Sequence, residues 1–231
     1  APSSGSDYTG RQTGSNINQL SNLALPSGSS GSVRVYIWLE DVAGNDSYTS
    51  AASVEARYDP TPPVTQRSTN PTYPAGGWYS STVTVNLTAT DQGSGVRETR
   101  WRRESGSWTA GTTFSVGETQ RVYYQSEDNV GNIEEAVSFQ VNIDTVAPNS
   151  SVSLSPGTPA SGWYNVPVQV SISATDSGGS GYKYSYYRFN GSGAFQRNNS
   201  VTVSDSGSYS LEFFSRDGAG NAEAVQTRAN Y

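Results

Sequence analysis

The sequence predicts an all-β protein built from repeated sandwich modules, on the basis of three observations. An apolar run that ends in Asp-x-x-Gly-Asn occurs three times, with its final asparagine at Asn45, Asn132 and Asn221. The copies are 87 and 89 residues apart, which is about the length of one small β-sandwich domain. The 24 Gly and 11 Pro, with abundant Ser, Thr and Val, are typical of strands and tight turns.

Composition excludes several classes of protein. The net charge of −6, with Lys183 as the only lysine, argues against a nucleic-acid partner, because phosphate binding needs a concentrated basic surface. Without Cys or His, the chain has no thiol site and lacks the usual general base near neutral pH. It also has no Met, so we expect a processed product, as after removal of an export signal. No apolar run reaches the roughly 20 residues of a membrane span, so we expect a secreted protein.

The first part of the chain contains fewer strand signals than the rest. Residues 1–16 are polar and rich in Gly and Ser, which is typical of a loop. Residues 17–25 carry four spaced apolar side chains, and the repeat context favours a strand there. Residues 33–40 form a strong strand pattern, and residues 51–58 alternate weakly and are predicted to close this module.

Two later modules have the same motifs in the same order. Gly77-Trp78-Tyr79 matches Gly162-Trp163-Tyr164, and an alternating apolar strand follows each motif. The remaining strands are expected at 99–103, 112–116 and 136–143 in one module, and at 184–189, 200–203 and 224–231 in the other. With the hairpin strands this makes about seven short strands per module, as expected for an immunoglobulin-like (Ig-like) sandwich.

Proline-containing junctions separate the modules. Residues 59–63 and 144–148 each begin with Asp and contain Pro, which fixes φ and ends strand pairing. We therefore predict an incomplete module over residues 1–58 and full modules over 59–143 and 144–231. Because a short linker that contains Pro acts as a spacer, we expect an extended rod.

The ordered motifs carry a family resemblance. Asp-x-x-x-Pro, Gly-Trp-Tyr, Ala-Thr-Asp-x-Gly-Ser-Gly and Asp-x-x-Gly-Asn, in that order, resemble the Ig-like repeats of bacterial extracellular and cell-surface proteins. Those repeats are in turn distantly similar to hyalin-type and fibronectin-type modules. The third module departs from the pattern by one inserted Gly. The resemblance covers residues 59–231 and only the later half of the first 58. It implies a structural or adhesive array outside the cell. Such modules also occur as appendages of secreted enzymes, and the resemblance does not imply a catalytic activity.

The first module lacks the sequence of about two opening strands. Three explanations stay open: the missing strands lie upstream in a longer protein, another chain completes the module, or residues 1–16 complete it in a different way. A half sandwich would expose inner-face side chains, and an open strand edge invites pairing with another chain. The candidate inter-subunit contacts are Leu20, Leu23, Val35, Ile37 and Val54.

Aspartates recur near turns and junctions in the later modules, at Asp91, Asp128, Asp144, Asp176 and Asp217. Oxygen-rich loops of this kind can bind Ca²⁺, but Asp, Asn and Gly also build turns without any ion. No Asp-x-Asp-x-Asp loop is present, so we favour turn chemistry and predict no metal and no cofactor.

Aromatic residues offer an alternative binding function. A sugar-stacking face could include Trp78, Trp101, Trp108, Trp163, Tyr79, Tyr164, Tyr184, Tyr186 and Tyr187. Aromatic residues in strands belong more often to the core or to a module junction, which we favour. The basic cluster of Arg100, Arg102 and Arg103 is interpreted as a solvated strand face rather than an anion site. Five Asn-x-Ser/Thr sequons begin at Asn45, Asn86, Asn149, Asn190 and Asn198 and are possible glycosylation sites.

Taken together, these patterns favour a non-enzymatic extracellular structural protein in a cell-surface filament, stalk or layer. Its expected partners are further copies of itself, joined head to tail, or neighbouring modules of a longer chain. The alternative is an adhesive or carbohydrate-binding accessory module of a larger secreted or surface-anchored protein, with surface glycans as partners. No catalytic residues are predicted, because a serine enzyme would lack its His and no carboxylate pair lies in a glycosidase signature.

Overall fold

A computed structural model describes residues 31–50 and 52–229 of the chain. Within these residues the structure is all-β apart from one short 3-10 helix, η1 (Tyr48–Ser50). None of the helices in the described part has the length and hydropathy that a membrane span requires. The chain divides into two compact units, one within residues 1–66, 88–100 and 124–137 and the other within 67–87, 101–123 and 138–231.

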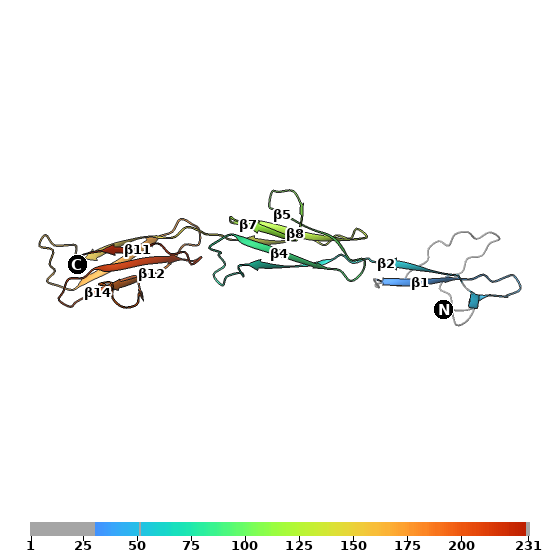
Figure 1. The fold of residues 1–231 in the computed structure, drawn as a ribbon, viewed down its shortest axis with the longest axis horizontal. Coiled ribbons are helices and arrows are strands. Elements are labelled where there is room, and N and C mark those ends of the chain that lie inside the picture. The colour runs from blue at the N-terminus through green and yellow to red at the C-terminus, as the bar shows by residue number, and fades with distance from the viewer. Residues whose placement is uncertain (1–30, 51, 230–231) are drawn as a thin grey trace. The chain divides into compact units, whose positions relative to one another are not determined.

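The first described element is a two-stranded antiparallel sheet. It pairs β1 (Gly31–Ile37) with β2 (Ala52–Tyr58) (Figure 1). In the register of this pair, Val35 lies opposite Val54. The strands predicted at 33–40 and 51–58 are therefore observed with slightly shifted ends. The strand predicted over residues 17–25 lies outside the described residues.

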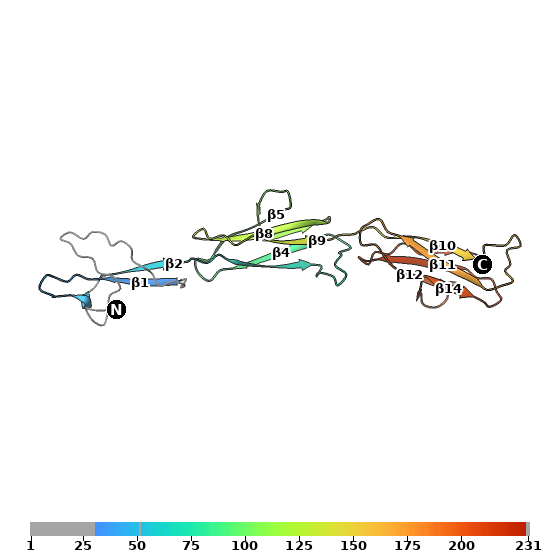
Figure 2. The same ribbon diagram turned by 180° about the vertical axis from the view of Figure 1, so that it is seen from behind.

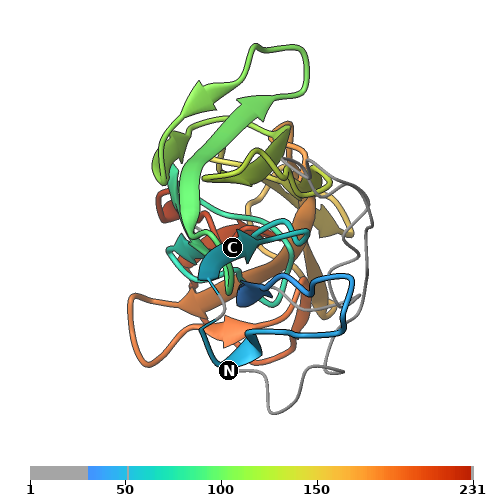
Figure 3. The same ribbon diagram turned by 90° about the vertical axis from the view of Figure 1, so that its right-hand side faces the viewer.

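Seven further strands form a pair of sheets. One sheet has the order β3-β4-β7 and the other the order β6-β5-β8-β9. The strands of the first sheet are β3 (Val64–Asn70), β4 (Val83–Thr90) and β7 (Thr113–Val116). Those of the second are β5 (Val96–Arg103), β6 (Thr109–Ala110), β8 (Gln120–Asp128) and β9 (Val137–Val141). The loop between β5 and β6 projects from its sheet (Figures 1 and 3).

The last seven strands repeat this topology. One sheet has the order β10-β11-β14, whose strands are labelled in Figure 2, and the other has the order β13-β12-β15-β16. The strands of the first sheet are β10 (Asn149–Ser155), β11 (Val168–Thr175) and β14 (Ser200–Val203). Those of the second are β12 (Tyr182–Phe189), β13 (Gln196–Arg197), β15 (Leu211–Asp217) and β16 (Gln226–Arg228). Seven short strands in two sheets form an Ig-like sandwich, so the predicted fold class is confirmed.

Each sandwich buries alternate residues of its strands. On β4, Val83, Val85 and Leu87 are buried while the residues between them are more exposed, because successive side chains of a strand point to opposite faces. The core of the last sandwich is a cluster of Val170, Ile172, Tyr187, Leu211 and Phe213. The module boundaries predicted after residues 58 and 143 fall between these sets of sheets and stay predictions.

Candidate functional site: two aspartate clusters beside the Asp-x-x-Gly-Asn loops

Three aspartates from separate loops converge beside the second Asp-x-x-Gly-Asn loop. Asp59 follows β2, Asp91 follows β4, and Asp128 ends β8. One carboxylate oxygen of each lies within 4.8 Å of the others. Asp128 is fully buried, whereas Asp59 and Asp91 are partly exposed. The strand ends therefore gather carboxylates that are more than 30 residues apart in the sequence.

Each of these carboxylates accepts hydrogen bonds from main-chain N–H groups. Asp128 accepts from the N–H groups of Val130 at 2.9 Å and Asn132 at 2.8 Å, which closes its own loop. Asp91 accepts from Gly93 at 3.1 Å and Gly95 at 2.7 Å. These are the turn bonds that short Asp side chains make with their own backbone.

Asp59 connects its segment to the loop after β4. Its carboxylate accepts from the N–H of Thr61 at 3.2 Å and from the N–H of Ser94 at 2.5 Å. Gly93 passes so close that a Cβ there would overlap the Asp59 carboxylate. Glycine at this position is therefore a steric requirement of the contact.

The last sandwich repeats the cluster with Asp144, Asp176 and Asp217, again within 4.8 Å. Asp144 accepts from the N–H of Val146 at 2.9 Å and of Ser180 at 3.0 Å. Asp217 accepts from the N–H of Asn221 at 2.8 Å. The inserted glycine of this module does not disturb the pattern.

The asparagine that ends each Asp-x-x-Gly-Asn motif ties the loop to the segment that precedes the sandwich. The side-chain amide of Asn132 donates to the Asp59 carbonyl oxygen at 2.9 Å and to the Asp128 carboxylate at 2.7 Å. The amide of Asn221 donates to the Asp144 carbonyl oxygen at 2.7 Å and to the Asp217 carboxylate at 2.7 Å. The two N–H donors of the asparagine amide allow it to make both bonds.

Hydrogen bonding favours the ionised form of Asp59, Asp128 and Asp144. The pKa of Asp59 is lowered from 3.8 to about 2, mainly by the hydrogen bond from the Ser94 N–H, with further lowering by Thr61. Burial is the largest single effect on Asp128 and Asp144 and would raise the pKa of each. Hydrogen bonds, from Asn132 to Asp128 and from Ser180 and Val146 to Asp144, outweigh burial and lower both pKa values.

The clusters are hard oxygen donors of the kind that Ca²⁺ prefers, and Ca²⁺ takes about six to eight such oxygens. The sequence favours turn chemistry for these aspartates, and the hydrogen bonds described above are turn and junction bonds. They account for the positions of the carboxylates without an ion, so the clusters by themselves assign no ligand.

The first copy of the motif forms the same loop. Asp41 accepts from the N–H groups of Ala43 and Asn45, each at 2.9 Å, and from the Asn45 amide at 2.8 Å. The loop therefore forms in the two-stranded β1–β2 sheet as it does in the two complete sandwiches.

A buried hydroxyl network joins the two sheets of each complete sandwich. The Ser126 hydroxyl on β8 lies 2.7 Å from that of Thr65 on β3 and 2.8 Å from that of Thr99 on β5. Glu134 accepts from the Thr65 N–H at 3.0 Å and also from its hydroxyl. Every hydroxyl of this buried network has a partner, which offsets the cost of burying it.

The last sandwich has the same network at equivalent positions. The Ser215 hydroxyl lies 2.6 Å from that of Ser150 and 2.7 Å from that of Ser185. Glu223 accepts from the N–H groups of Ser150 at 3.1 Å and Ser215 at 2.7 Å. Sequence reasoning missed both networks, and the signal that could have found them is a hydroxyl or Glu recurring at matched positions of the aligned modules. The first module has Leu39 where the others have Ser126 and Ser215.

The structure does not gather the predicted aromatic residues into one face. Tyr79 and Tyr187 are buried in the sandwiches, and Trp101 stacks on Phe114 with ring centroids 4.0 Å apart. Trp163 instead lies in a loop with 71% of its surface exposed. Trp78 is half-buried, and the Tyr164 hydroxyl donates to that of Thr158. The Trp108 ring lies beneath the Arg102 guanidinium.

One aromatic group does form on the last sandwich. Tyr186 on β12 stacks on Phe214 on β15 with centroids 4.9 Å apart, and Tyr184 meets Tyr186 edge-on. These rings are partly exposed, on the opposite side of their strands from the buried Tyr187 and Phe213. This group was only partly predicted, because Phe214 comes from a different strand.

Two members of the predicted basic cluster, Arg102 and Arg103, contact aromatic rings. The Arg102 guanidinium lies 4.1 Å from the centre of the Tyr123 ring and donates to the Glu104 carbonyl oxygen at 2.6 Å. Arg103 lies over the ring of Trp101 at 5.6 Å. These contacts are cation–π pairs on a strand face.

The remaining predicted positions can be placed in part. Ile37 and Val54 are exposed and Val35 is partly buried, whereas Leu20 and Leu23 lie outside the described residues. Among the sequon asparagines, Asn86 is partly buried and accepts from the Thr113 hydroxyl, and the other four are exposed: Asn45, Asn149, Asn190 and Asn198. Neither the inter-subunit contacts nor glycosylation is tested by these placements, and both stay predictions.

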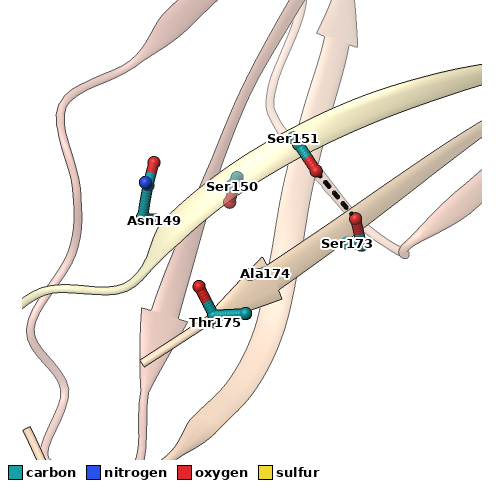
Figure 4. A pocket seen from close by; sticks show the side chains of 6 residues that line it. All are labelled: Asn149, Ser150, Ser151, Ser173, Ala174 and Thr175. Carbon is teal, nitrogen blue, oxygen red and sulfur yellow. Dashed lines mark hydrogen bonds between the residues drawn. The ribbon is translucent and has the colours of Figure 1, made fainter. Parts of the chain in front are cut away.

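A shallow hollow lies between β10 and β11 (Figure 4). Its walls are the small side chains of Asn149, Ser150, Ser151, Ser173, Ala174 and Thr175. The Ser151 and Ser173 hydroxyls are 2.9 Å apart and bond to each other. A hollow lined by small neutral groups has no pair of titratable residues for acid–base chemistry.

No protein-family model and no curated protein matches the chain. Among solved structures, it is similar to the fibronectin(III)-like modules of Clostridium thermocellum CbhA, with a TM-score of 0.38 and 11% identity over 65% of this chain and 84% of that one. It is also similar to the D00-D0 domain of intimin, with a TM-score of 0.33 and 15% identity over 72% of this chain and 100% of that one. Likenesses this distant carry no argument about function, so the fold class rests on the strand pairing described above.

Proposed function

We propose that the chain is a non-enzymatic extracellular structural protein whose tandem Ig-like modules form part of a cell-surface filament, stalk or layer. In this proposal the modules serve as spacing and connecting elements, and copies of the chain associate head to tail.

The observation that carries the proposal is the duplicated tie between each sandwich and the segment that leads into it. The carbonyl oxygen of Asp59 is held by Asn132, and its carboxylate is held by the loop that contains Ser94. Asp144 is held in the same two ways by Asn221 and by the loop that contains Ser180. A repeated array needs a defined connection between successive modules, and this tie supplies one at each sandwich.

The chemistry of the chain supports a non-catalytic role. It has no His and no Cys, so it has neither the base of a serine triad nor a thiol nucleophile. The carboxylates that converge are engaged with main-chain N–H groups of their own or neighbouring loops. They act as structural acceptors in the described residues.

Electron microscopy and surface labelling test the proposal together. Purified protein, examined by negative stain over a range of concentrations, should show filaments or layers. Antibodies against the chain should label intact, unpermeabilised cells of the source organism. Dispersed monomers under every condition, together with labelling only after permeabilisation, would contradict the proposal.

The aromatic group on the last sandwich supports a second candidate, a carbohydrate-binding or adhesive accessory module. Partly exposed rings of Tyr184, Tyr186 and Phe214 lie beside an Arg188–Glu212 ion pair of 2.6 Å. Rings can stack on sugar faces while the ion pair offers hydrogen bonds to hydroxyl groups. A glycan array tests this candidate: binding lost in Tyr186→Ala would support it, and an array without hits would remove it.

A further inference from the structure

The Gly-Trp-Tyr loop of residues 74–79 already has a partner inside the chain. A Cβ built on Gly179 would lie 3.1 Å from the Trp78 ring, so the ring packs directly against that glycine. A Cβ built on Gly76 would lie 3.1 Å from the Gly218 carbonyl oxygen. All four residues belong to the second compact unit. The loop therefore sits on two glycine-bearing loops of the last sandwich, one of them the Asp-x-x-Gly-Asn loop.

The equivalent loop of the last sandwich presents the same structure to solvent. Its turn is closed by a hydrogen bond from the Gly162 N–H to the Pro159 carbonyl oxygen at 2.9 Å, the same bond and length as between Gly77 and Pro74. Trp163 is 71% exposed, whereas Trp78 is partly buried. A Cβ on Gly162 would meet nothing within 4 Å. Trp is among the side chains that contribute most to interfaces, so a preformed loop that exposes one is a candidate contact.

A loop of the receiving type is exposed on the first module. Residues 41–45 fold with the same hydrogen bonds as the two later Asp-x-x-Gly-Asn loops. Val42 occupies the position of Gly218, and its side chain is completely exposed. Leu39, which precedes the loop, is 74% exposed. The loop thus offers apolar surface at the position that contacts a Gly-Trp-Tyr loop elsewhere in the chain.

We propose that the loop of residues 159–164 of one chain docks on the loop of residues 41–45 of a second copy, with Trp163 packing on Val42 and Leu39. The occupant is a second copy because loop 159–164 repeats the loop that makes the internal contact, and loop 41–45 repeats one of the two loops that receive it, the one that meets Gly76. The two surfaces differ, so the contact is heterologous and repeats from chain to chain. This inference rests on the proposed self-association and names the surface that would carry it.

The joint should be weaker than a permanent interface. Two small loops bury an area at the low end of the range for protein contacts. Ser161 also replaces Gly76, and Val42 replaces Gly218, so the loops cannot approach as closely as in the internal contact. We therefore expect the associated fraction of the chain to increase as its concentration is raised from about 10 μM to about 1 mM, the range in which weak transient complexes form.

Sedimentation velocity of the full chain over that range tests the joint. The unsubstituted chain should form a ladder of oligomers, whereas Trp163→Ala and Val42→Asp should each remain monomeric. Val130→Asp is the matched control, because Val130 is an exposed valine on the Asp-x-x-Gly-Asn loop of the first complete sandwich. It should associate as the unsubstituted chain does. All three positions are in exposed loops, and unchanged circular dichroism and melting would show that each variant folds.

Mixing the two variants that do not self-associate tests whether the two loops bind each other. Trp163→Ala keeps an intact Val42 loop, and Val42→Asp keeps an intact Trp163 loop. An equimolar mixture should therefore form one joint and stop at a 1:1 dimer, with a blue shift of tryptophan emission as Trp163 leaves water. A mixture that stays monomeric, or either variant assembling alone, would overturn the proposal.

The outcomes separate this inference from the proposed function. Filaments seen by microscopy that persist in Trp163→Ala would leave the structural function standing and overturn this joint. An unsubstituted chain that remains monomeric up to 1 mM would overturn the joint. Unlabelled cells together with dispersed protein in the microscope would count against the function itself.

Discussion

Asn132 and Asp59 are 73 residues apart in the sequence, yet the Asn132 side-chain amide donates to the Asp59 carbonyl oxygen at 2.9 Å. Asn221 and Asp144, 77 residues apart, make the same bond at 2.7 Å. Each amide also binds the aspartate that begins its own loop. The last residue of the repeated motif therefore specifies how the chain enters the sandwich as well as the shape of a turn.

Replacing this asparagine should destabilise the sandwich. Asn221→Ala leaves the Asp144 carbonyl and one oxygen of the buried Asp217 carboxylate without this donor, which should lower the free energy of unfolding by about 1–3 kcal/mol. Urea unfolding followed by circular dichroism measures the change. Asn198→Ala is the control, since Asn198 is exposed and its side chain accepts from the next two N–H groups. Equal losses in the two variants would contradict the tie.

Acid should weaken the junction at Asp59. Because its folded-state pKa is about 2 and the ordinary value is 3.8, its contribution to stability is present above pH 4 and is lost as the pH falls towards 2. Asp59→Asn should therefore show a smaller loss of stability between pH 4 and pH 2 than the unsubstituted chain. The exposed Asp205 gives the comparison, and Asp205→Asn should keep the full loss. Thermal melts at half-unit pH steps give stability as a function of pH for each variant. A curve for Asp59→Asn that runs parallel to that of the unsubstituted chain would contradict the prediction.

Substitution by alanine should have different effects on stability at Gly178 and at Gly157. A Cβ on Gly178 would overlap the Asp144 carboxylate, so Gly178→Ala must displace the junction and should cost about 1–3 kcal/mol. A Cβ on Gly157 would meet nothing within 4 Å, so Gly157→Ala should be neutral or slightly stabilising. Chemical denaturation of both variants provides the measurement. A neutral Gly178→Ala would show that the loop after β11 does not pack on Asp144.

Removing a buried core side chain should destabilise the last sandwich strongly. Leu211 is fully buried in the cluster with Val170 and Phe213, so Leu211→Ala should cost about 2–5 kcal/mol. Val225 is half exposed, and Val225→Ala should cost less than about 1 kcal/mol. Calorimetry of the two variants would test the difference, and similar melting temperatures would contradict the assignment of Leu211 to the core.

Local patterns were sufficient to predict most strands. The alternation of Val83, Val85 and Leu87 placed β4, and the spacing of Val168, Val170 and Ile172 placed β11, because a half-buried strand must alternate. The predicted strand at 200–203 has the bounds of β14. The predicted ends of other strands shift by a few residues, since strand ends depend on the neighbouring strand rather than on their own sequence.

The candidate site was less predictable, because its contacts join residues far apart in the chain. Turn chemistry at Asp91 and Asp128 follows from the adjacent Gly and Asn residues, but nothing local indicates that their carboxylates converge with Asp59. The Ser126 hydroxyl shows the same limit: a serine within an apolar strand reads as an interruption until its partner on β3 is known.

The hydroxyl network affects how a sandwich would respond to tension along the chain. Tension that reaches the last module at Asp144 first loads the bonds from Asn221 and Ser180 and then β10, whose Ser150 is bound to both Ser215 and Glu223. Peeling β10 away would have to rupture these buried bonds together with the first rungs of its strand pairing. Each complete module therefore has buried hydrogen bonds on the strand that follows its junction, where they would resist applied tension.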